Sequence, residues 1–405
     1  MLSAVLLMSL LAMPQAPEAP VGPPTQAEAE ALALDGQYEA ALDAFRRRAA
    51  INPRDHEARM WIARLHGWMG NPERAEPVFR SVMLEDPTRL DAIIGTGMTL
   101  VALGRDEDGI EMLERAEAIE PQNAEVLAGL GLAHTLAGHT SRGVRYAERA
   151  VDIDPRISHR ETLEQARLIH GHRVELTSFG EHYDTGIRDT GSVDLRINVR
   201  VREDLRIIGR GQHQRKFGFS EQRGGGGLDW RWRRETSLFG QVLIGPKGND
   251  VLPRVDVNGE IVHTEGPTQW VAGYRYFDFP SAQLSVLSPG VTWWPSARLS
   301  LSARYYLSLT DFATGTTMEQ GHSAALRGSS RLVPRVWITA GYARGTENFE
   351  TLSPDRIGDF RANTASGGLR IDLPSLTSVL GTYEYQWRPG SIEMQRLSLS
   401  LLQRF

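Results

Sequence analysis

A chain of 405 residues with a formal net charge of −5 has no basic excess with which to neutralise phosphates, so nucleic-acid binding is not expected. The absence of cysteine excludes a disulfide scaffold, a thiolate zinc site, a cysteine nucleophile and a lipid-modified N-terminal cysteine. Aromatic residues are unevenly distributed, since 25 of the 31 lie in residues 173–405, which predicts a helical first part and a β-rich second part.

The chain opens with a continuous apolar run over residues 2–12, followed by a Pro- and Ala-rich stretch. The run has the length of the apolar region of a secretory signal and is too short to span a membrane as a helix. No Lys or Arg precedes it, and no clean cleavage site follows it. We expect residues 1–21 to be a signal peptide, with a buried N-terminal helix as the alternative, and the cleavage site stays open.

A 34-residue period runs through residues 22–157. The period appears in prolines (Pro53, Pro87, Pro121, Pro155), in glycines (Gly36, Gly70, Gly104, Gly138) and at two positions that hold only Ala or Gly (Ala29, Ala63, Gly97, Gly131 and Ala41, Ala75, Gly109, Gly143). The spacing predicts a helix–turn–helix unit in which Gly ends the first helix, Pro ends the second, and the small residues allow the two helices to cross closely. Such units must stack to bury their apolar faces.

This pattern resembles the tetratricopeptide repeat over four units. Large residues occupy the aromatic position of the second helix at Phe45, Phe79 and Leu113, while Ala147 departs from the family pattern. The aromatic position of the first helix also departs, with Leu32, His66, Leu100 and His134. Thr25 and Glu28 predict a capping box at the first helix, and residues 158–170 predict a closing helix. We therefore expect an α-solenoid domain over residues 22–170.

The concave face of such a solenoid is its expected binding surface, and the helix pattern places Met60, Arg64, Ile94, Met98 and Leu132 on it. The Lys and Asn residues with which tetratricopeptide domains hold C-terminal carboxylates are absent from these positions. A clamp for chaperone tails is therefore not expected. Two hypotheses remain, namely a groove that docks a periplasmic protein or polymer and a solenoid surface without a partner.

From residue 173 the apolar period changes from 3.6 to 2. Apolar and polar side chains alternate over residues 193–202, 255–261, 299–309 and 379–388. Period two gives a strand one apolar and one polar face, as in a soluble sandwich or a membrane barrel. The segments run about ten residues, long enough to cross a bilayer with tilt, their polar faces carry repeated charges, and aromatics cluster near their ends. These features favour an antiparallel transmembrane β-barrel over residues 171–405.

The connections also sort by length. Short turns are expected near residues 201–204, 233–236, 264–267, 294–297, 333–335 and 372–376, and longer links include residues 184–190, 310–318 and 347–360. We predict about 14 strands, beginning near residues 173, 191, 204, 223, 236, 252, 268, 282, 297, 319, 335, 361, 376 and 391, with 12 or 16 left open. An even number places both ends of the barrel, and therefore the repeats, on the periplasmic side.

The last residues resemble the signal by which outer-membrane barrels are recognised by the barrel assembly machinery. Leu397, Leu399, Leu401 and Phe405 share one face of the expected final strand. Gln403 departs from the pattern, because an apolar residue is usual there. A chance C-terminal Phe on a soluble strand is the alternative.

Repeats joined to such a barrel resemble the YaiO-like outer-membrane proteins, and more distantly the exporters of bacterial exopolysaccharides that join periplasmic repeats to a barrel. The resemblance rests on architecture and covers nearly the whole chain. It implies a bacterial outer-membrane protein in contact with membrane lipid, with its repeats in the periplasm. The exporter resemblance implies polysaccharide passing through the barrel. We expect envelope transport or exopolysaccharide export, and the alternative is a non-transporting anchor whose repeats dock periplasmic proteins.

No motif in the sequence points to catalysis. Gly-x-Ser-x-Gly, His-Glu-x-x-His and Walker sequences are absent. The run Gly224–Gly227 lacks the Lys-Ser/Thr of a phosphate loop, so a flexible loop or the start of a strand is favoured there. His170 and His172 are interpreted as linker residues and not as metal ligands. We expect no enzyme activity, no metal and no cofactor, and an outer-membrane enzyme is kept as a third hypothesis.

The inward polar face of the barrel is the main candidate site. Strand parity places on it Asp194, Arg196, Arg200, Asp229, Arg231, Asp256, Glu260, Arg275, Arg304, Glu384 and Arg388. Opposite charges would pair across strands, and arginines would steer an anionic or partly deacetylated sugar polymer. Fourteen strands spaced about 4.8 Å apart and tilted by about 40° form a cylinder about 28 Å across at the Cα atoms. Side chains would narrow it to about the width of one glycan chain, unless a loop plugs it. Substrate, direction of transport, oligomeric state and the opening of the lumen stay undetermined.

Overall fold

The computed structural model describes residues 25–184, 189–313, 318–345, 362–388 and 392–405. The expected signal peptide, residues 1–21, lies outside the described residues. The chain divides into two compact units, one of Met1–Ala137 with Arg145–Arg160 and one of Gly138–Val144 with Glu161–Phe405. The first contains most of the helical repeats and the second contains the β-barrel, and each is described by itself.

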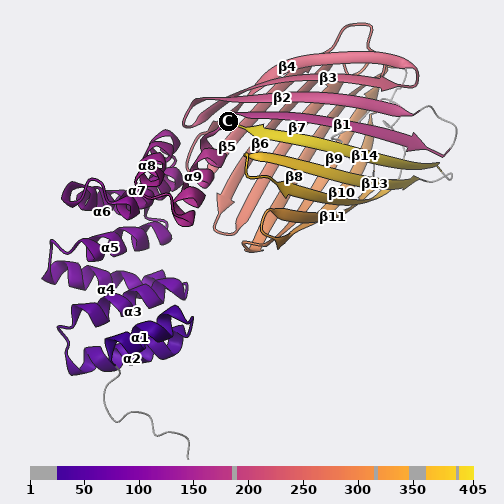
Figure 1. Cartoon of the computed structure of the whole chain (residues 1–405). Helices are drawn as coiled ribbons and strands as arrows, with labels where there is room; N and C mark the ends of the chain where they lie inside the picture. The colour runs from indigo at the N-terminus through magenta and orange to yellow at the C-terminus, as the bar shows by residue number, and fades with distance from the viewer. Residues whose placement is uncertain (1–24, 185–188, 314–317, 346–361, 389–391) are drawn as a thin grey trace, which may run out of the picture. The chain divides into compact units, whose positions relative to one another are not determined.

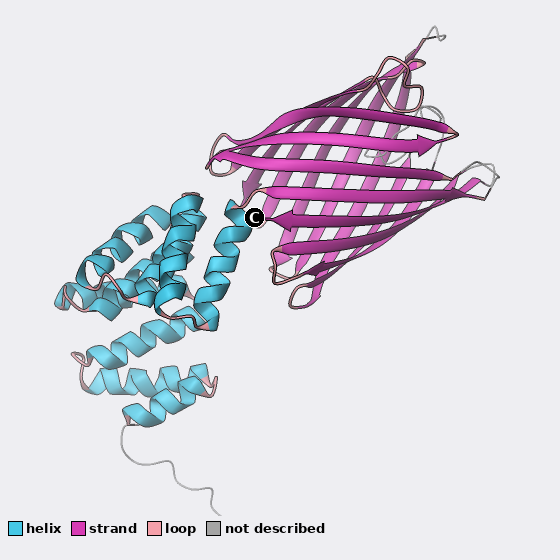
Figure 2. Ribbon diagram, turned by 45° about the horizontal axis from the view of Figure 1, so that its top comes forward, coloured by secondary structure: helices cyan, strands magenta, loops and turns pink. Residues whose placement is uncertain are grey.

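The described part of the chain forms nine helices (Figures 1 and 2). They are α1 (Gln26–Leu34), α2 (Tyr38–Ile51), α3 (His56–Trp68), α4 (Pro72–Glu85), α5 (Leu90–Ala102), α6 (Asp106–Ile119), α7 (Ala124–Ala137), α8 (Thr140–Ile153) and α9 (Ile157–His170). The predicted capping box is present, because Thr25 and Glu28 each accept a hydrogen bond from the other's backbone N–H, at 3.3 and 2.7 Å. Among the described residues, no helix is long and apolar enough to cross a membrane.

The four periodic glycines end the first helix of each unit, as predicted. Their φ angles are 78°, 74°, 73° and 94° at Gly36, Gly70, Gly104 and Gly138, a left-handed conformation that is favourable only without a Cβ. The fully buried Phe45 and Leu113 and the buried Phe79 hold the second-helix aromatic position in the repeat core. The solenoid of tetratricopeptide repeats is therefore confirmed.

The small residues lie where helices cross. A Cβ added to Gly109 of α6 would lie 2.5 Å from Val101 Cγ2 and 2.9 Å from the Gly97 carbonyl oxygen of α5. A Cβ added to Gly97 would lie 2.8 Å from Leu113 Cγ. The two backbones therefore approach closely only because both positions are glycine, as the repeat pattern predicts.

The second unit contains a closed antiparallel barrel of 14 strands (Figures 1 and 2), which confirms the predicted number. The strands are β1 (Arg173–Tyr183), β2 (Thr190–Arg202), β3 (Leu205–Lys216), β4 (Phe219–Arg231), β5 (Thr236–Ile244), β6 (Val255–Glu265), β7 (Thr268–Asp278), β8 (Ala282–Ser296), β9 (Leu299–Phe312), β10 (Glu319–Val333), β11 (Val336–Gly345), β12 (Ala362–Asp372), β13 (Thr377–Arg388) and β14 (Ile392–Arg404). β1 pairs with β14 from Arg173↔Arg404 to Tyr183↔Met394, so the first and last strands close the barrel.

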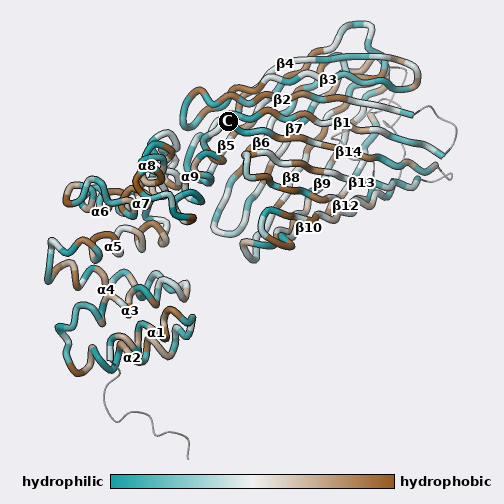
Figure 3. Tube along the Cα trace, viewed as in Figure 1, coloured by the Kyte–Doolittle hydropathy of each residue, from teal (hydrophilic) through white to brown (hydrophobic). Residues whose placement is uncertain are grey.

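The outward face is apolar, as the alternation predicts, and Figure 3 shows the corresponding change of hydropathy along the strands. Exposed aliphatic side chains alternate with inward polar ones along β2, where Val193, Leu195 and Ile197 face out. Exposed tryptophans lie near the end with the short turns, at Trp230, Trp270 and Trp293. Such residues are typical of the interfacial belt of a membrane barrel.

Connections at one end of the barrel are short, for example residues 203–204 and 334–335. At the other end the connections vary in length. The one between β3 and β4 consists only of Phe217 and Gly218, whose φ angles are 55° and 90°. We call the two ends the turn end and the loop end. The longer links near residues 184–190, 310–318 and 347–360 lie partly or wholly outside the described residues. The glycines 224–227 lie inside β4, which begins at Phe219, so the prediction of a flexible loop there is wrong and the strand starts slightly earlier than predicted.

Candidate functional site in the barrel lumen

The inward side chains of the barrel enclose a cavity of about 710 Å³. Residues from every strand except β4 line it, because the ladder register brings their inward positions to the same level. The lining includes three aromatic side chains, Phe179, Phe239 and Tyr306. Most of the remaining lining is polar, so the cavity is suited to a hydrated or hydrogen-bonding ligand.

Six arginines and four carboxylates line this cavity. Most of the arginines form ion pairs, many of them across neighbouring strands: Arg196 with Glu175 at 3.6 Å, Arg210 with Asp194 at 2.8 Å, Arg275 with Asp256 at 2.7 Å, Arg304 with Glu260 at 2.6 Å and Arg396 with Glu384 at 2.8 Å. The pairs fix the side chains against the wall and leave the interior polar with little net charge.

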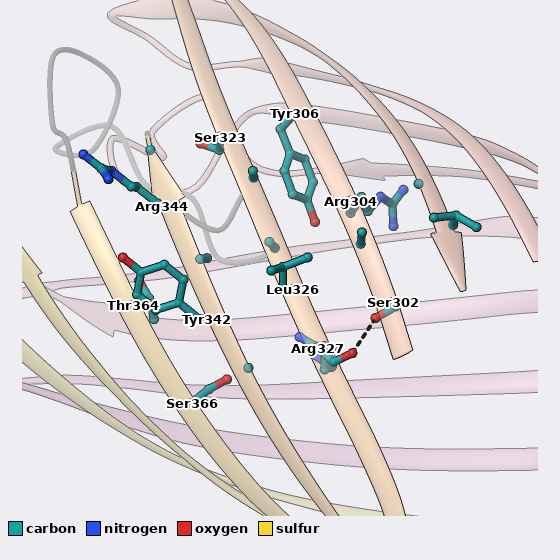
Figure 4. Close-up of a pocket in the computed structure, with 18 of the residues that line it drawn as sticks. Ser302, Arg304, Tyr306, Ser323, Leu326, Arg327, Tyr342, Arg344, Thr364 and Ser366 are labelled. Atoms are coloured by element: carbon teal, nitrogen blue, oxygen red, sulfur yellow. Dashed lines mark hydrogen bonds between the residues drawn. The ribbon is translucent and has the colours of Figure 1, made fainter. Parts of the chain in front are cut away.

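The wall is asymmetric. The long charged side chains come mainly from β1–β9, whereas β10–β14 present mostly small ones, including Ser329, Thr339, Ser366, Thr382, Ser398 and Ser400. A recess of about 180 Å³ lies over β9–β12 (Figure 4). Arg304, Tyr306 and Arg327 line it from the neighbouring strands β9 and β10. The small residues therefore lie on the side of the barrel that carries this recess.

Toward the loop end the inward side chains are packed and buried. Glu181 is 3% exposed and forms ion pairs with Lys216 at 3.4 Å and Arg396 at 2.5 Å, which ties β1 to β3 and β14. Phe277, Leu284 and Val286 form a small apolar cluster on β7 and β8. Passage of a polymer along the axis would require these side chains to move.

A loop of ten residues between β5 and β6, Gly245–Arg254, is held mainly by one carboxylate, and Asn249 Nδ2 also donates to the Gln222 carbonyl at 3.0 Å. Glu221 accepts hydrogen bonds from the N–H groups of Asp250 (2.6 Å), Val251 (3.0 Å) and Leu252 (2.6 Å). Glu221 shares the inward face of β4 with Arg223, whose guanidinium binds Asp256 at 2.9 Å across the interior side. The backbone of this loop therefore folds toward the lumen, where Leu252 is fully buried.

At the turn end two arginines hold the end of α9. The Arg200 guanidinium donates to the carbonyls of Ile169 and His170, and that of Arg206 donates to Ile169 and Gly171, all at 2.8–2.9 Å. These carbonyls are the acceptors that a helix end leaves unsatisfied. Burial and the nearby Arg200 charge lower the pKa of His170 below its usual value. Arg200 thus binds the end of α9 and does not line the cavity as the strand parity predicted.

The structure places the other predicted lumen residues at three levels. Asp194, Arg196, Glu260, Arg275, Arg304 and Glu384 line the cavity. Asp256 is buried between Arg223 and Arg275, and Arg388 is buried beside Gln386 nearer the loop end. Asp229 and Arg231 line a separate pocket of about 220 Å³ with Arg200 at the turn end.

Sequence reasoning missed several functional candidates, namely Glu181, Arg210, Lys216, Glu221, Arg223, Arg327 and Arg396. A signal for Arg396 was present, because it has the parity of the polar Ser398 and Ser400 between outward leucines. On β3 the signal was hidden, because Ile208 faces inward and Arg215 outward, which breaks the alternation.

In the repeats, the predicted groove is wrong at two positions. Met60 is fully buried and Ile94 is buried in the helical core, so neither is available to a partner. Arg64 lies at the surface, where it pairs with Asp91 at 3.3 Å and stacks over Trp61. Met98 and Leu132 are partly buried against the core.

The residues of the expected assembly signal lie outward. Leu397, Leu399, Leu401 and Phe405 are exposed, with Leu397 at 68%. Among the residues that the structure describes, no group of three or more metal-binding side chains lies together.

Comparison with known proteins identifies both parts of the chain. Residues 32–93 and 68–133 match the tetratricopeptide repeat, and residues 171–343 match the YaiO membrane beta barrel domain. Both resemblances predicted from the sequence are confirmed. A closed barrel with this domain fits an outer-membrane location. No curated protein matches the chain.

Several solved structures are similar to parts of the chain. A thermophilic tetratricopeptide repeat protein of Thermus thermophilus is 25% identical over 35% of this chain and 78% of its own, with a TM-score of 0.33. MamA of Desulfovibrio magneticus is 24% identical over 35% of this chain and 80% of its own, with a TM-score of 0.31. A bacterial polysaccharide outer membrane secretin is 11% identical over 58% of this chain and 99% of its own, with a TM-score of 0.41.

Proposed function

Since the chain joins tetratricopeptide repeats to a YaiO membrane β-barrel domain, we propose that it acts in transport across the bacterial outer membrane, with a hydroxyl-rich polymer such as an exopolysaccharide as cargo. The observation that supports this proposal is the polar cavity of about 710 Å³ inside the barrel. Its serines, threonines and ion-paired arginines offer hydrogen bonds to hydroxyl groups, and Phe179, Phe239 and Tyr306 offer flat apolar faces for sugar rings.

The paired charges of the wall suit passage better than tight retention. An arginine that already binds a carboxylate keeps its position, and it seldom gives up that bond to form hydrogen bonds with a passing neutral group. A polar chain can therefore exchange weak hydrogen bonds with the wall as it advances. The small side chains of β10–β14 leave room for such a chain along one side of the lumen.

The topology supports a periplasmic position for the repeats. β1 begins and β14 ends at the turn end of the barrel, because Arg173 pairs with Arg404. Short turns of outer-membrane barrels face the periplasm, so the repeats would gather periplasmic partners at the entrance. The surface around Arg64, Met98 and Leu132 is the part of the predicted groove that stays accessible to them.

A second candidate function is a non-transporting outer-membrane anchor whose repeats dock periplasmic proteins. The observation that favours it is the packed loop end, where Glu181, Lys216 and Leu252 are buried and the loop Gly245–Arg254 folds inward. A barrel that stays in this state would hold the repeats at the membrane without a path through it.

Planar bilayers distinguish the two functions. Refolded full-length protein should show conductance that the host's own polysaccharide blocks, and unrelated neutral polymers too wide for the lumen should leave that conductance unchanged. If the protein shows no conductance and a periplasmic protein binds the repeats, the anchor function is favoured. Extraction of the protein by aqueous buffer, without heat-modifiable gel mobility, would contradict the membrane location on which both functions depend.

A further inference from the structure

One arginine of the lumen differs from the others that line the cavity. Five of the six lining arginines each form an ion pair with a carboxylate, namely Arg196, Arg210, Arg275, Arg304 and Arg396. Within the described residues Arg327, on β10, has none, although it lines both the cavity and the recess over β9–β12. Its guanidinium is exposed to the lumen and keeps its donors available.

The surroundings of Arg327 leave room for a ligand. In the ladder its neighbours at the same level are Ser302 on β9 and Gly341 on β11, followed by Ser366 on β12. A Cβ added to Gly341 would lie 2.6 Å from Ser366 Oγ and 3.9 Å from Arg327 Cγ, so the absence of a side chain at Gly341 lets the Ser366 hydroxyl lie close to Arg327. Figure 4 shows Arg327 beside Ser302, whose hydroxyl donates to the Arg327 carbonyl, with Arg304 and Tyr306 farther along β9 in the same recess.

Two other donors in the cavity lack acceptors. The buried Nε of Arg304 and the Nε2 of Gln241, a residue that is 5% exposed, have no hydrogen-bond partner. Both residues line the cavity, and buried donors without acceptors are unfavourable, so the wall itself leaves polar groups unsatisfied there. Five of the six lining arginines are already paired with carboxylates, two of which, Asp256 and Glu181, lie outside the lining, so Arg327 carries the lining charge that an anion would balance.

We infer that the lumen holds a binding site for an acidic saccharide, with the Arg327 guanidinium holding its carboxylate. The planar fork of arginine matches a carboxylate with two parallel hydrogen bonds. Ser302 and Ser366 supply hydroxyls for the sugar, and the ring of Tyr306 supplies a face for it. The inference rests on the proposed function for the nature of the cargo and names its chemical class, an acidic and not a neutral glycan.

Equilibrium binding to full-length protein in detergent tests the site without requiring passage. Trigalacturonate, maltotriose and inorganic phosphate serve as the acidic, the neutral and the sugar-free probe in calorimetric titrations. Trigalacturonate should bind, maltotriose and phosphate should bind at least about tenfold more weakly, and Arg327→Gln should weaken trigalacturonate about tenfold, the loss of one charged hydrogen-bonded pair. Arg327→Lys should retain part of the affinity, since it keeps the charge but loses the fork.

The control is Arg298→Gln, which removes the same charge from the exposed turn between β8 and β9 and should leave the affinity unchanged. All variants must keep the heat-modifiable mobility of the parent protein. Equal affinity of Arg327→Gln and parent, or maltotriose bound as tightly as trigalacturonate, overturns the inference. If phosphate binds as tightly as trigalacturonate, the inference that the ligand is a saccharide is overturned.

Failure of this site and failure of transport are distinguishable. Trigalacturonate bound through Arg327 by a barrel that never conducts supports the site and refutes transport. Conductance that neutral glycans block as well as acidic ones, without an effect of Arg327→Gln, supports transport and refutes the site.

Discussion

Replacing Glu221 by alanine should release the loop Gly245–Arg254 from the lumen. Its carboxylate accepts from three successive backbone N–H groups, those of Asp250, Val251 and Leu252. Hydrogen bonds to a charged group contribute about 1.5–3 kcal/mol each, so the variant loses about 6 kcal/mol that holds the loop. Burial of the Val251 and Leu252 side chains stabilises the closed loop by at most about 3–5 kcal/mol. Ordering the ten loop residues costs about 1 kcal/mol of conformational entropy for each residue, which is more than the burial of these two side chains contributes.

The expected result is a larger conductance in planar bilayers for Glu221→Ala than for the parent protein, together with faster tryptic cleavage after Lys247 in the loop. Glu221→Asp keeps the charge on a shorter stem and should fall between the two. Glu265→Ala, which removes an exposed carboxylate near the turn end, is the matched control and should behave as the parent. If Glu221→Ala left both the conductance and the cleavage rate unchanged, the loop would not limit passage, and the reasoning from the carboxylate would be refuted.

Four further predictions concern the rest of the chain. Gly109→Ala should destabilise the repeats by about 1–3 kcal/mol despite the better helix propensity of Ala, because the new Cβ meets Val101 at 2.5 Å. Gly67→Ala, where nothing lies within 4 Å, should stabilise them by about 0.5–1 kcal/mol, and denaturant unfolding followed by helical circular dichroism measures both. Burial and two nearby arginines lower the pKa of His66 below about 6.5 in the folded state. The unfolded state therefore takes up the proton first, so the repeats should lose stability as the pH falls below about 6.5, and a flatter pH profile in His66→Gln checks this. Deleting Phe405 should lower the amount of folded protein in the outer membrane, and normal levels on membrane fractionation would count against an assembly signal.

Most of the barrel was predictable because its pattern is local. An alternation such as that of Val193 and Asp194 reports which face of a strand meets lipid, and the turn residues mark where strands end. The 14 observed strands begin within four residues of the predicted positions. The 34-residue period likewise located the helices of the repeats, because each glycine and proline acts on its own neighbours.

The candidate site was less predictable, because it depends on pairing between distant strands. Arg304 and Arg327 look alike in the sequence, yet the Arg304 side chain reaches Glu260 on β6 at 2.6 Å, whereas Arg327 lies between Ser302 and Gly341 in the ladder. Parity placed Arg200 on the inward face, and only the structure shows that its donors bind the end of α9. The loop Gly245–Arg254 was not singled out, because nothing in its composition indicates that Glu221, more than twenty residues earlier, binds its backbone.

The ends of the barrel segment meet at one point. The N–H of His172, at the start of the barrel, donates to the Phe405 carbonyl at 2.8 Å, and the Phe405 N–H donates back to His172 at 3.1 Å. The ring of His172 also lies 5.7 Å from that of Phe405. These contacts cannot form until the last strand has been synthesised and has paired with the first, more than 200 residues away. The turn that follows α9 is therefore completed only when the barrel closes, so a barrel without its last strand lacks these two hydrogen bonds, which distinguishes it from a closed one.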